Sequence, residues 1–149
     1  MKVSTKGRYG LRAMVELAKN YGSFPLSVKS ISQSQNVSFS YMEQILNRLN
    51  KARLVRSIKG VGGGFILARR PENIKIIEIL SALEDTITPV FCVENPESCK
   101  KTKNCVAHLF WKKLDAKIKE VLRTTTLKDL CEWEKKRQIK KDEDFLMED

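Results

Sequence analysis

The sequence predicts a mainly α-helical fold in which a helix-turn-helix is followed by a two-stranded wing and then by a long C-terminal helix. Three observations carry this prediction. Apolar residues recur at helical spacing on either side of a tight turn at Asn36. Two short alternating segments then flank a glycine-rich turn at 59–64, as in a β-hairpin. One heavy apolar stripe runs through about 105–123, outside this compact head.

The 149 residues allow one domain, or a small domain with an extension, and their net charge of +10 is unevenly distributed. Residues 1–80 hold 14 Lys and Arg against 4 Glu, whereas residues 81–149 hold 14 charges of each sign. A basic module joined to a neutral one is typical of a nucleic-acid-binding head, although a solvated basic face has the same composition. We therefore expect a DNA-binding domain at 1–84, a cysteine-rich loop at 85–104, a dimerisation helix with a short capping segment at 105–133, and a charged, mobile tail at 134–149.

A first helix is predicted from the start of the chain to about Tyr21. Ser4 or Thr5 can cap it, and its apolar residues recur on one face. Cations crowd its first turns, where they oppose the helix macrodipole, and this placement suits a nearby phosphate. These cations are Lys2, Lys6, Arg8 and Arg12.

The helix-turn-helix comes next. Ser27 caps a short helix that ends near Gln35. A third helix then reaches about Ala52, and Ser40-x-x-Glu43 at its start matches a capping box. A short helix, a tight turn and an amphipathic helix together outline a helix-turn-helix, although many small helical domains share this outline.

The segment after the third helix predicts a wing. Residues 54–58 and 65–68 read as strands, and a flexible glycine turn joins them. The glycine run is not a phosphate-binding loop, because a P-loop ends in Gly-Lys-Ser/Thr and here Phe65 follows Gly64. A dinucleotide-binding fingerprint needs a third glycine at that position and a helix after it. A hairpin directly behind a helix-turn-helix is instead a wing, whose glycines allow close approach to a ligand surface.

Polar residues of this head are candidate DNA contacts. The helix over 38–50 is expected to enter the major groove, with the wing in the neighbouring minor groove and basic residues on phosphates. Glu43 has two interpretations, because a capping-box carboxylate is structural, whereas a free one accepts from cytosine and repels phosphate. The candidate DNA-binding residues are Lys2, Lys6, Arg8, Ser38, Ser40, Tyr41, Glu43, Gln44, Arg48, Arg56, Lys59 and Gly60.

Three of the four cysteines and the only histidine gather in one stretch and are candidate metal ligands: Cys92, Cys99, Cys105 and His108. Soft thiolates with one imidazole suit iron–sulfur iron or zinc rather than magnesium or calcium. Zinc sites usually carry ligand pairs separated by about 2–4 residues, whereas iron–sulfur clusters tolerate wider gaps such as those between these cysteines. An iron–sulfur cluster is therefore the leading interpretation, and zinc, free thiols or a redox disulfide are the alternatives.

A long helix is predicted from about Cys105 to Arg123. It lies outside the head, so its apolar stripe needs a cover, and a second copy of the chain is the commonest one. The alternative is that the helix packs on its own head. The predicted dimer-interface residues are Phe110, Trp111, Leu114, Ile118, Val121 and Leu122. A short capped segment follows over 124–133, with Cys131 as a buried thiol rather than a ligand.

Composition also bounds the setting. No signal peptide follows Met1, and no run approaches the roughly 20 apolar residues of a membrane span. We expect a cytoplasmic, reduced protein without structural disulfides and without a membrane partner. An enzyme is not expected, because catalysis needs a general base near the metal and the one histidine is itself a candidate ligand. A small iron–sulfur electron carrier is a further alternative, but it needs neither a basic head nor a wing.

With head, wing and cysteine loop described, the chain resembles the winged-helix bacterial repressors of the Rrf-two superfamily, and within it the iron–sulfur cluster regulators. The stretches STKGRYGLRAMVELA, SYMEQILNRL, SIKGVGGGFIL and TTTLKDL match that pattern, over Met1 to about Leu130. The resemblance implies a homodimer that binds a palindromic operator in double-stranded DNA and represses genes for cluster assembly. It also implies a [2Fe-2S] cluster held by Cys92, Cys99, Cys105 and His108, with a [4Fe-4S] cluster or zinc as alternatives.

Two departures and two sister branches bear on this resemblance. The gap between Cys92 and Cys99 is one residue longer than usual, and Lys59 stands where arginine is usual at the wing tip. The nitric-oxide sensors of the superfamily offer a carboxylate from the N-terminal helix, but residues 1–15 contain none. The cysteine-metabolism regulators lack the three-cysteine loop. A nitric-oxide, redox or cysteine-responsive regulator is therefore the alternative function.

Overall fold

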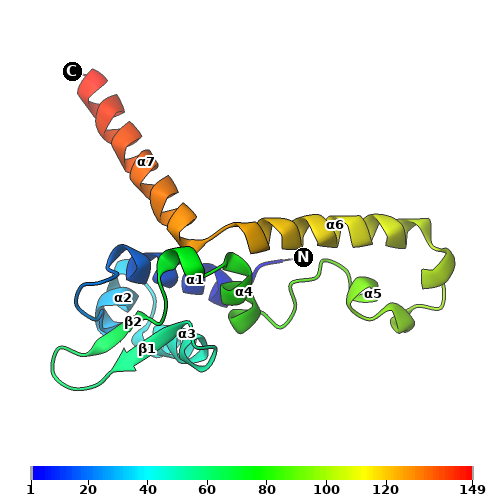
Figure 1. Ribbon diagram of the computed structural model, residues 1–149, viewed down its shortest axis with the longest axis horizontal. Coiled ribbons are helices and arrows are strands. Elements are labelled where there is room, and N and C mark those ends of the chain that lie inside the picture. The colour runs from blue at the N-terminus through cyan, green and yellow to red at the C-terminus, as the bar shows by residue number, and fades with distance from the viewer. Residues whose placement is uncertain (1, 149) are drawn as a thin grey trace.

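The computed structural model describes residues 2–148; helices make up most of it, and a two-stranded antiparallel sheet lies at one edge (Figure 1). The helices and strands are α1 (Thr5–Lys19), α2 (Val28–Gln35), α3 (Phe39–Lys51), β1 (Val55–Ile58), β2 (Gly64–Leu67), α4 (Ile76–Leu83), α5 (Phe91–Glu94), α6 (Val106–Thr124) and α7 (Leu127–Met147). Short 3₁₀ turns lie at η1 (Pro71–Asn73), η2 (Pro96–Ser98) and η3 (Thr102–Asn104). The mainly helical fold with a two-stranded wing is confirmed.

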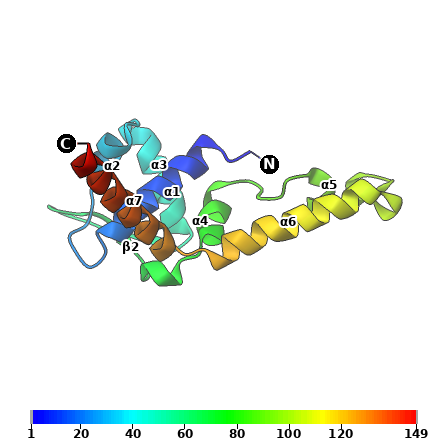
Figure 2. The same ribbon diagram turned by 90° about the horizontal axis from the view of Figure 1, so that it is seen from above.

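Three parts of the molecule are distinguished in Figures 1 and 2. The head comprises α1 to α4 with the β1–β2 hairpin. The arm comprises residues 85–124 and extends sideways from the head, with α6 running beside the segment that carries α5. Helix α7 projects from the side of the head opposite to α3 and the hairpin.

Serine caps fix the starts of the helices in the head. The Ser4 hydroxyl accepts from the Gly7 N–H at 3.1 Å, and Ser27 caps α2 in the same way. Asn36 ends α2 in the left-handed region with φ 55° and ψ 49°, which Asn tolerates better than most residues. The predicted turn between the second and third helices is therefore confirmed.

The predicted capping box at the start of α3 is wrong. The Ser38 hydroxyl accepts from the Tyr41 N–H at 3.2 Å, so Ser38 is the N-cap. Ser38 has the extended backbone that a cap requires, whereas Ser40 already lies inside the helix. Glu43 is exposed on the helix surface, so the structural interpretation of its carboxylate is removed.

One hydrophobic core joins the elements of the head. It is built from the apolar stripes of α1, α3 and α4 and from the inward side of the hairpin, and the first residue of α7 closes it. Each large side chain buried here contributes roughly 1.5–3 kcal/mol to folding. The fully buried large side chains are Met14, Ile31, Met42, Ile45, Leu46, Leu49, Leu54, Val55, Ile74, Ile79, Leu83 and Leu127.

The wing is fixed at its base and open at its tip. Its strands pair from Val55 with Leu67 to Ile58 with Gly64. A further bridge joins Leu26 to β2, because the Phe65 N–H donates to the Leu26 carbonyl oxygen at 2.8 Å. This close approach requires glycine at position 64: φ there is +154°, and a Cβ would lie 2.2 Å from the Leu26 oxygen.

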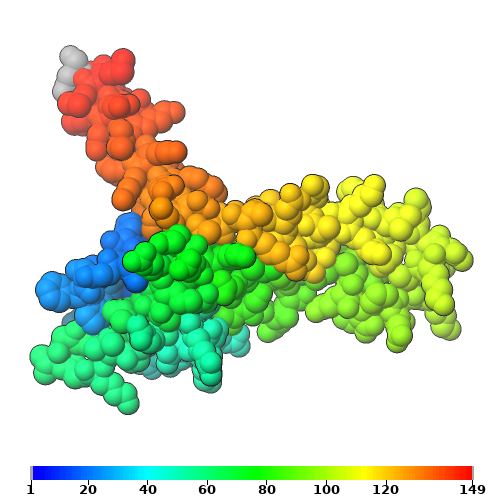
Figure 3. All heavy atoms as spheres, in the orientation of Figure 1, coloured from blue at the N-terminus to red at the C-terminus, as the bar shows by residue number. Residues whose placement is uncertain are grey.

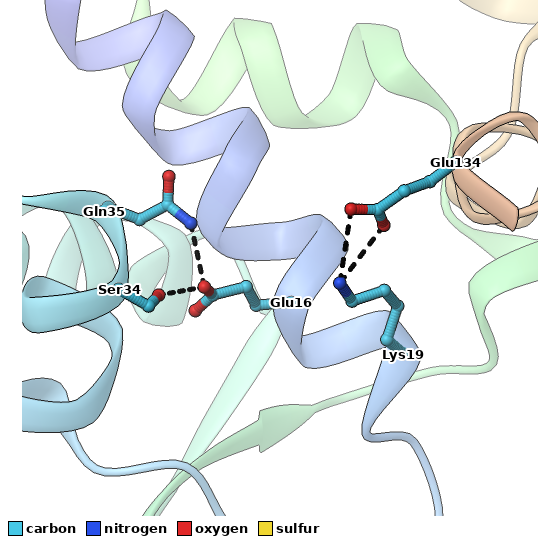
Figure 4. A network of polar contacts seen from close by, with 5 residues as sticks. All are labelled: Glu16, Lys19, Ser34, Gln35 and Glu134. Carbon is cyan, nitrogen blue, oxygen red and sulfur yellow. Dashed lines mark hydrogen bonds and ion pairs between the residues drawn. The ribbon is translucent and has the colours of Figure 1, made fainter. Parts of the chain in front are cut away.

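Helix α1 holds the head together through polar contacts on two sides (Figure 4). The Glu16 carboxylate accepts from the Gln35 amide at 2.8 Å and from the Ser34 hydroxyl, which ties α1 to the end of α2. Lys19 forms an ion pair with Glu134 of α7 at 3.2 Å. That pair is about half exposed, so its contribution to stability is at most about 1 kcal/mol.

The arm leaves the head after one end of α4 and returns beside the other end. It departs after Leu83, and its last residues come back to Ile74 and Ile76. There the Ile76 N–H donates to the Thr125 carbonyl oxygen at 3.0 Å, and the Leu127 N–H donates to the Ile74 carbonyl oxygen at 2.9 Å. The eight-residue helix α4 is therefore the base to which both ends of the arm are attached.

Helix α7 is longer than the sequence predicts. A capping box of Thr126 and Asp129 starts it, as expected of a capped segment. The helix then continues past Trp133 to Met147, and its C-terminal part projects away from the head (Figure 3). That its charged end is mobile in solution stays a prediction. Within residues 2–148, no helix is both long enough and apolar enough to cross a membrane.

Candidate functional site

The arm brings two of the four candidate metal ligands together. His108 lies in the first turn of α6 and is only 7% exposed. Its Nδ1 is 3.3 Å from the Sγ of Cys92, which lies on α5 and is half-buried. Cys105 is the N-cap of α6 and is also half-buried. Helix α6 thus presents a thiol and an imidazole three residues apart at its start, near a second thiol from α5.

The fourth candidate, Cys99, is exposed between η2 and η3. Among residues 2–148, no group of three or more His, Cys, Asp or Glu side chains lies close enough to hold a metal ion. The donor set still fits a soft metal, because three thiols and one imidazole lie within one short segment. All four candidates therefore do not surround one common site in this conformation.

The segment around Cys99 consists of short turns rather than regular structure. Hydrogen bonds within it are local, such as the Thr102 hydroxyl donating to the Cys99 carbonyl oxygen at 2.8 Å. Lys100, Lys101 and Lys103 flank that cysteine and are exposed. The segment therefore combines short-range hydrogen bonds with a cluster of exposed cations.

The candidate DNA-contacting residues of α3 lie on an open surface. Ser38, Ser40, Glu43 and Gln44 are exposed along the start of the helix. Figure 1 shows α3 and the hairpin on one side of the head, away from α7. A helix and a wing on one face match the arrangement in which the helix enters a major groove and the wing reaches the adjacent minor groove.

Two predicted contacts of α3 have partners within the protein. Tyr41 is half-buried and packs edge-to-face against Tyr9, with ring centroids 6.5 Å apart. The Arg48 guanidinium donates to the Leu83 carbonyl oxygen at 3.4 Å. Arg48 therefore has a structural partner at the end of α4, which its sequence position alone does not indicate.

The remaining candidates lie on the hairpin and at the start of α1. Arg56, Lys59 and Gly60 are exposed on the hairpin. At the start of α1, Lys2 and Arg8 are exposed and Lys6 is half-buried.

Glu84 supplies the negative charge that the first turn of α1 lacks. Its carboxylate accepts from the Ser4 N–H at 2.9 Å and from the Ser4 hydroxyl at 2.7 Å. A carboxylate at this position is favourable with the helix macrodipole. The cations at the start of α1 therefore have a balancing anion within the head.

Sequence-based reasoning missed two exposed apolar residues on the α3 and wing face. Phe39, the first residue of α3, is 52% exposed, and Val61 at the wing tip is fully exposed. Phe39 falls in register with Met42 and Leu46, so periodicity assigns it to the core. Phe39 is exposed to solvent because it lies in the first turn of α3, beyond the edge of the core.

The predicted dimer-interface stripe of α6 divides into two groups. Trp111, Leu114, Ile118 and Leu122 are half-buried, and α6 contacts α4 and α5 within the same chain. Phe110 and Val121 are exposed, as are Val106 and Leu109, which were not predicted. An apolar face is therefore exposed on α6, and it combines Phe110 and Val121 of the predicted stripe with Val106 and Leu109.

Cys131 is separate from the metal-ligand candidates. It lies on α7, is half-buried and packs against the core of the head. Burial, with the nearby Glu134 carboxylate as a lesser cause, raises the pKa of its thiol. A raised pKa disfavours the thiolate, so this residue is a structural thiol, as predicted, though less deeply buried than expected.

Comparisons with known proteins agree with this geometry. A family model described as Rrf2, iron-dependent transcriptional regulator, matches residues 3–133. The HTH-type transcriptional regulator CymR of Bacillus subtilis is 44% identical over 89% of this chain and 91% of its own. Its crystal structure, titled as the global cysteine regulator of B. subtilis, has a TM-score of 0.72 at 42% identity and covers 89% of this chain and 98% of that one. The structure of T. potens IscR has a TM-score of 0.75 at 39% identity, and the match covers 93% of this chain and 91% of that one.

Proposed function

Because the chain belongs to the Rrf2 family of transcriptional regulators, we propose that it binds a palindromic DNA operator as a homodimer and that an iron–sulfur cluster on its arm controls that binding. The relatives are named regulators and not enzymes, so the chain is not an enzyme. The observation that carries the cluster proposal is the contact between buried His108 and Cys92, beside a segment with two further cysteines.

The head performs the DNA-binding part of this proposal. Ser40 and Gln44 on α3 have no other role in the fold and can donate to or accept from base edges. Glu43 is likewise free, and an exposed carboxylate at the groove favours cytosine and disfavours close phosphates. Lys59 and Arg56 on the wing attract the phosphates of the adjacent minor groove. Family names and exposure support these roles.

The arm performs the sensing part. Cys92, Cys99, Cys105 and His108 are the residues that would hold the group, which is [2Fe-2S] by resemblance, with [4Fe-4S] or zinc as alternatives. When bound, the group would cross-link α5, the segment around Cys99 and the start of α6. Since the candidates form no group of three or more within residues 2–148, assembly of the ligands requires part of the arm to move. Binding of the group would favour the arrangement in which its ligands lie together.

Dimerisation follows from the uncovered apolar face of α6. Val106, Leu109, Phe110 and Val121 lie exposed on α6. A two-fold pairing of arms would cover this face and hold two heads at one spacing, as a palindrome requires. The same arm then carries both the ligands and the dimer contact, so a change at the cysteines alters the placement of the heads.

A cysteine-responsive regulator is the second candidate, and one observation favours it. The chain is 44% identical to CymR, whose solved structure is titled a global cysteine regulator. In that case the four arm residues hold no cluster and a cysteine-related signal acts elsewhere. The two candidates share the DNA-binding head and differ in what the arm binds.

Purification without oxygen separates the two candidates. The wild-type protein should be coloured and contain about two iron atoms and two sulfides per subunit if the cluster is [2Fe-2S]. Cys92→Ala should lose the colour, and Cys131→Ala, a change of the same kind at the structural thiol, should keep it. A colourless protein without iron after reconstitution, with normal DNA binding, would favour the cysteine-responsive function. Stoichiometric zinc in place of iron would refute cluster sensing.

A further inference from the structure

We propose that the joint formed by Leu83 and Glu84, at the C-terminal end of α4, is the mechanical link through which the arm positions the recognition helix α3. The inference deepens the proposed function and rests on it, because it concerns how a change at the cysteines reaches the DNA-binding surface. Glu84 ends α4 and is the last residue before the arm begins.

The joint is bonded to α1. Both hydrogen bonds from Ser4, from its N–H and from its hydroxyl, end on one oxygen of Glu84. These residues are 80 positions apart in the chain, so the contact is a tertiary one that ties the first turn of α1 to the root of the arm. Carboxylate acceptors make the stronger hydrogen bonds found in proteins. Movement of Glu84 therefore pulls on the start of α1.

The joint is also bonded to α3. The Arg48 guanidinium, near the end of the recognition helix, donates to the carbonyl oxygen of Leu83. The Leu83 side chain is 2% exposed and belongs to the same core as Ile45 of α3. Arg48 is therefore a positioning residue for α3 in addition to any contact with phosphate. One side chain couples the end of α4 directly to the helix that enters the groove.

Helix α1 approaches the joint closely on one side. A Cβ at Gly7 would lie 2.0 Å from the Glu84 Oε1, and a Cβ at Gly10 would lie 2.1 Å from the Leu83 Cδ1. The backbone of α1 thus lies against both residues of the joint. Close-packed interiors transmit displacements rather than absorbing them. A shift of α4 must therefore move α1 and α3 or break these contacts.

The arm is attached to both ends of α4. It begins after Glu84, and the segment that follows α6 is hydrogen-bonded to Ile74 and Ile76 at the other end. A change in the arm consequently turns or shifts α4 as a unit. Through Glu16, α1 is bonded in turn to Ser34 and Gln35 of α2 (Figure 4). Both helices of the helix-turn-helix are thus connected to the joint, α3 directly and α2 through α1.

The test compares operator affinities of cluster-loaded and cluster-free protein. The probe is a DNA duplex selected by the wild-type protein from a random-sequence library, and the readout is the ratio of the two Kd values by fluorescence anisotropy. Glu84→Ala breaks the bonds to Ser4, and the ratio should fall toward one while the absorption spectrum of the cluster stays unchanged. Glu84→Gln keeps an acceptor and should retain most of the wild-type ratio. Gly10→Ala inserts a methyl group against Leu83 and should change the ratio as well.

Asp85→Ala is the matched control. Asp85 is the next residue, is exposed, and makes no hydrogen bond or ion pair within residues 2–148, so its loss should leave the ratio at the wild-type value. Amide hydrogen exchange gives a second readout: removal of the cluster should change protection in α1 and α3 of the wild type, and the change in α1 should be lost in Glu84→Ala, which leaves the Arg48 bond to Leu83 intact. A wild-type ratio different from one that persists both in Glu84→Ala and in Arg48→Ala overturns this inference alone. A wild-type ratio of one overturns the proposed function, and the inference with it.

Discussion

Replacing Phe110 by Asp should separate the proposed dimer without unfolding the subunit. Phe110 is 58% exposed on α6, so the isolated subunit depends little on its burial. In a two-fold dimer the same residue contributes from both copies, and each lost contact counts twice. Leu114, another residue of the predicted stripe, is a poorer probe because it is already half-buried within its own chain.

The expected magnitude follows from this exposure. Full burial of a Phe side chain contributes roughly 1.5–3 kcal/mol. Because 58% of the side chain is still exposed, a partner can contribute about half of that per copy, or about 2–3 kcal/mol per dimer. A carboxylate placed in an apolar interface adds a penalty of several kcal/mol. A total above about 4 kcal/mol weakens the dimer by at least about 1,000-fold.

Sedimentation equilibrium over a range of protein concentrations measures this change. Phe24→Asp is the matched control, because Phe24 is 83% exposed in the connection after α1, away from the arm. The control should have the wild-type dissociation constant, and Phe110→Asp should sediment as a folded monomer with weakened operator binding. If Phe110→Asp dimerises as tightly as the control, the exposed face of α6 is not the dimer interface.

Three further predictions concern the wing and the structural thiol. Lys59→Ala should lower the slope of log affinity against log salt by about one unit, and an unchanged slope with unchanged affinity would mean that the wing does not contact DNA. Gly64→Ala should lower the thermal unfolding midpoint more than Gly22→Ala, because its Cβ meets the Leu26 carbonyl group whereas a Cβ at Gly22 meets open space; equal midpoints would contradict the bridge to Leu26. Since burial raises the pKa of Cys131, iodoacetamide at about pH 8, near the ordinary thiol pKa, should modify it more slowly than exposed Cys99. Equal modification rates would argue against the raised pKa. The raised pKa also means that the free energy of folding contributed by the neutral Cys131 thiol is present at lower pH and is lost as the pH rises through that pKa.

The head could be predicted from sequence because its signals are local. Apolar spacing in α1 and α3, the serine before each helix and the glycine turn of the wing each depend on neighbouring residues. The error at the start of α3 arose because Ser38 and Ser40 are both capable caps, and the box pattern favoured the wrong one. Backbone conformation, with Ser38 extended and Ser40 helical, decides between them.

The arm and α7 were predicted less well, for physical reasons. Periodicity shows that α6 has an apolar stripe, but the position of the neighbouring chain decides which side is covered, and this turned Leu114 inward and left Phe110 outside. High charge predicted a tail where the structure continues the helix. The bond between Ser4 and Glu84 joins positions 80 residues apart, and no local pattern indicates such a contact.

The central claim is that occupancy of the cysteine segment controls operator binding. Its most direct test uses one anaerobic preparation, with operator affinity measured at one salt concentration before and after a chelator removes the metal. Couplings between sites typically change affinity by about 5–150-fold, so the account predicts a difference of that order in the wild type. Cys92→Ala should show one affinity throughout, with or without chelator. Equal affinities of the loaded and cluster-free wild-type protein would contradict the account.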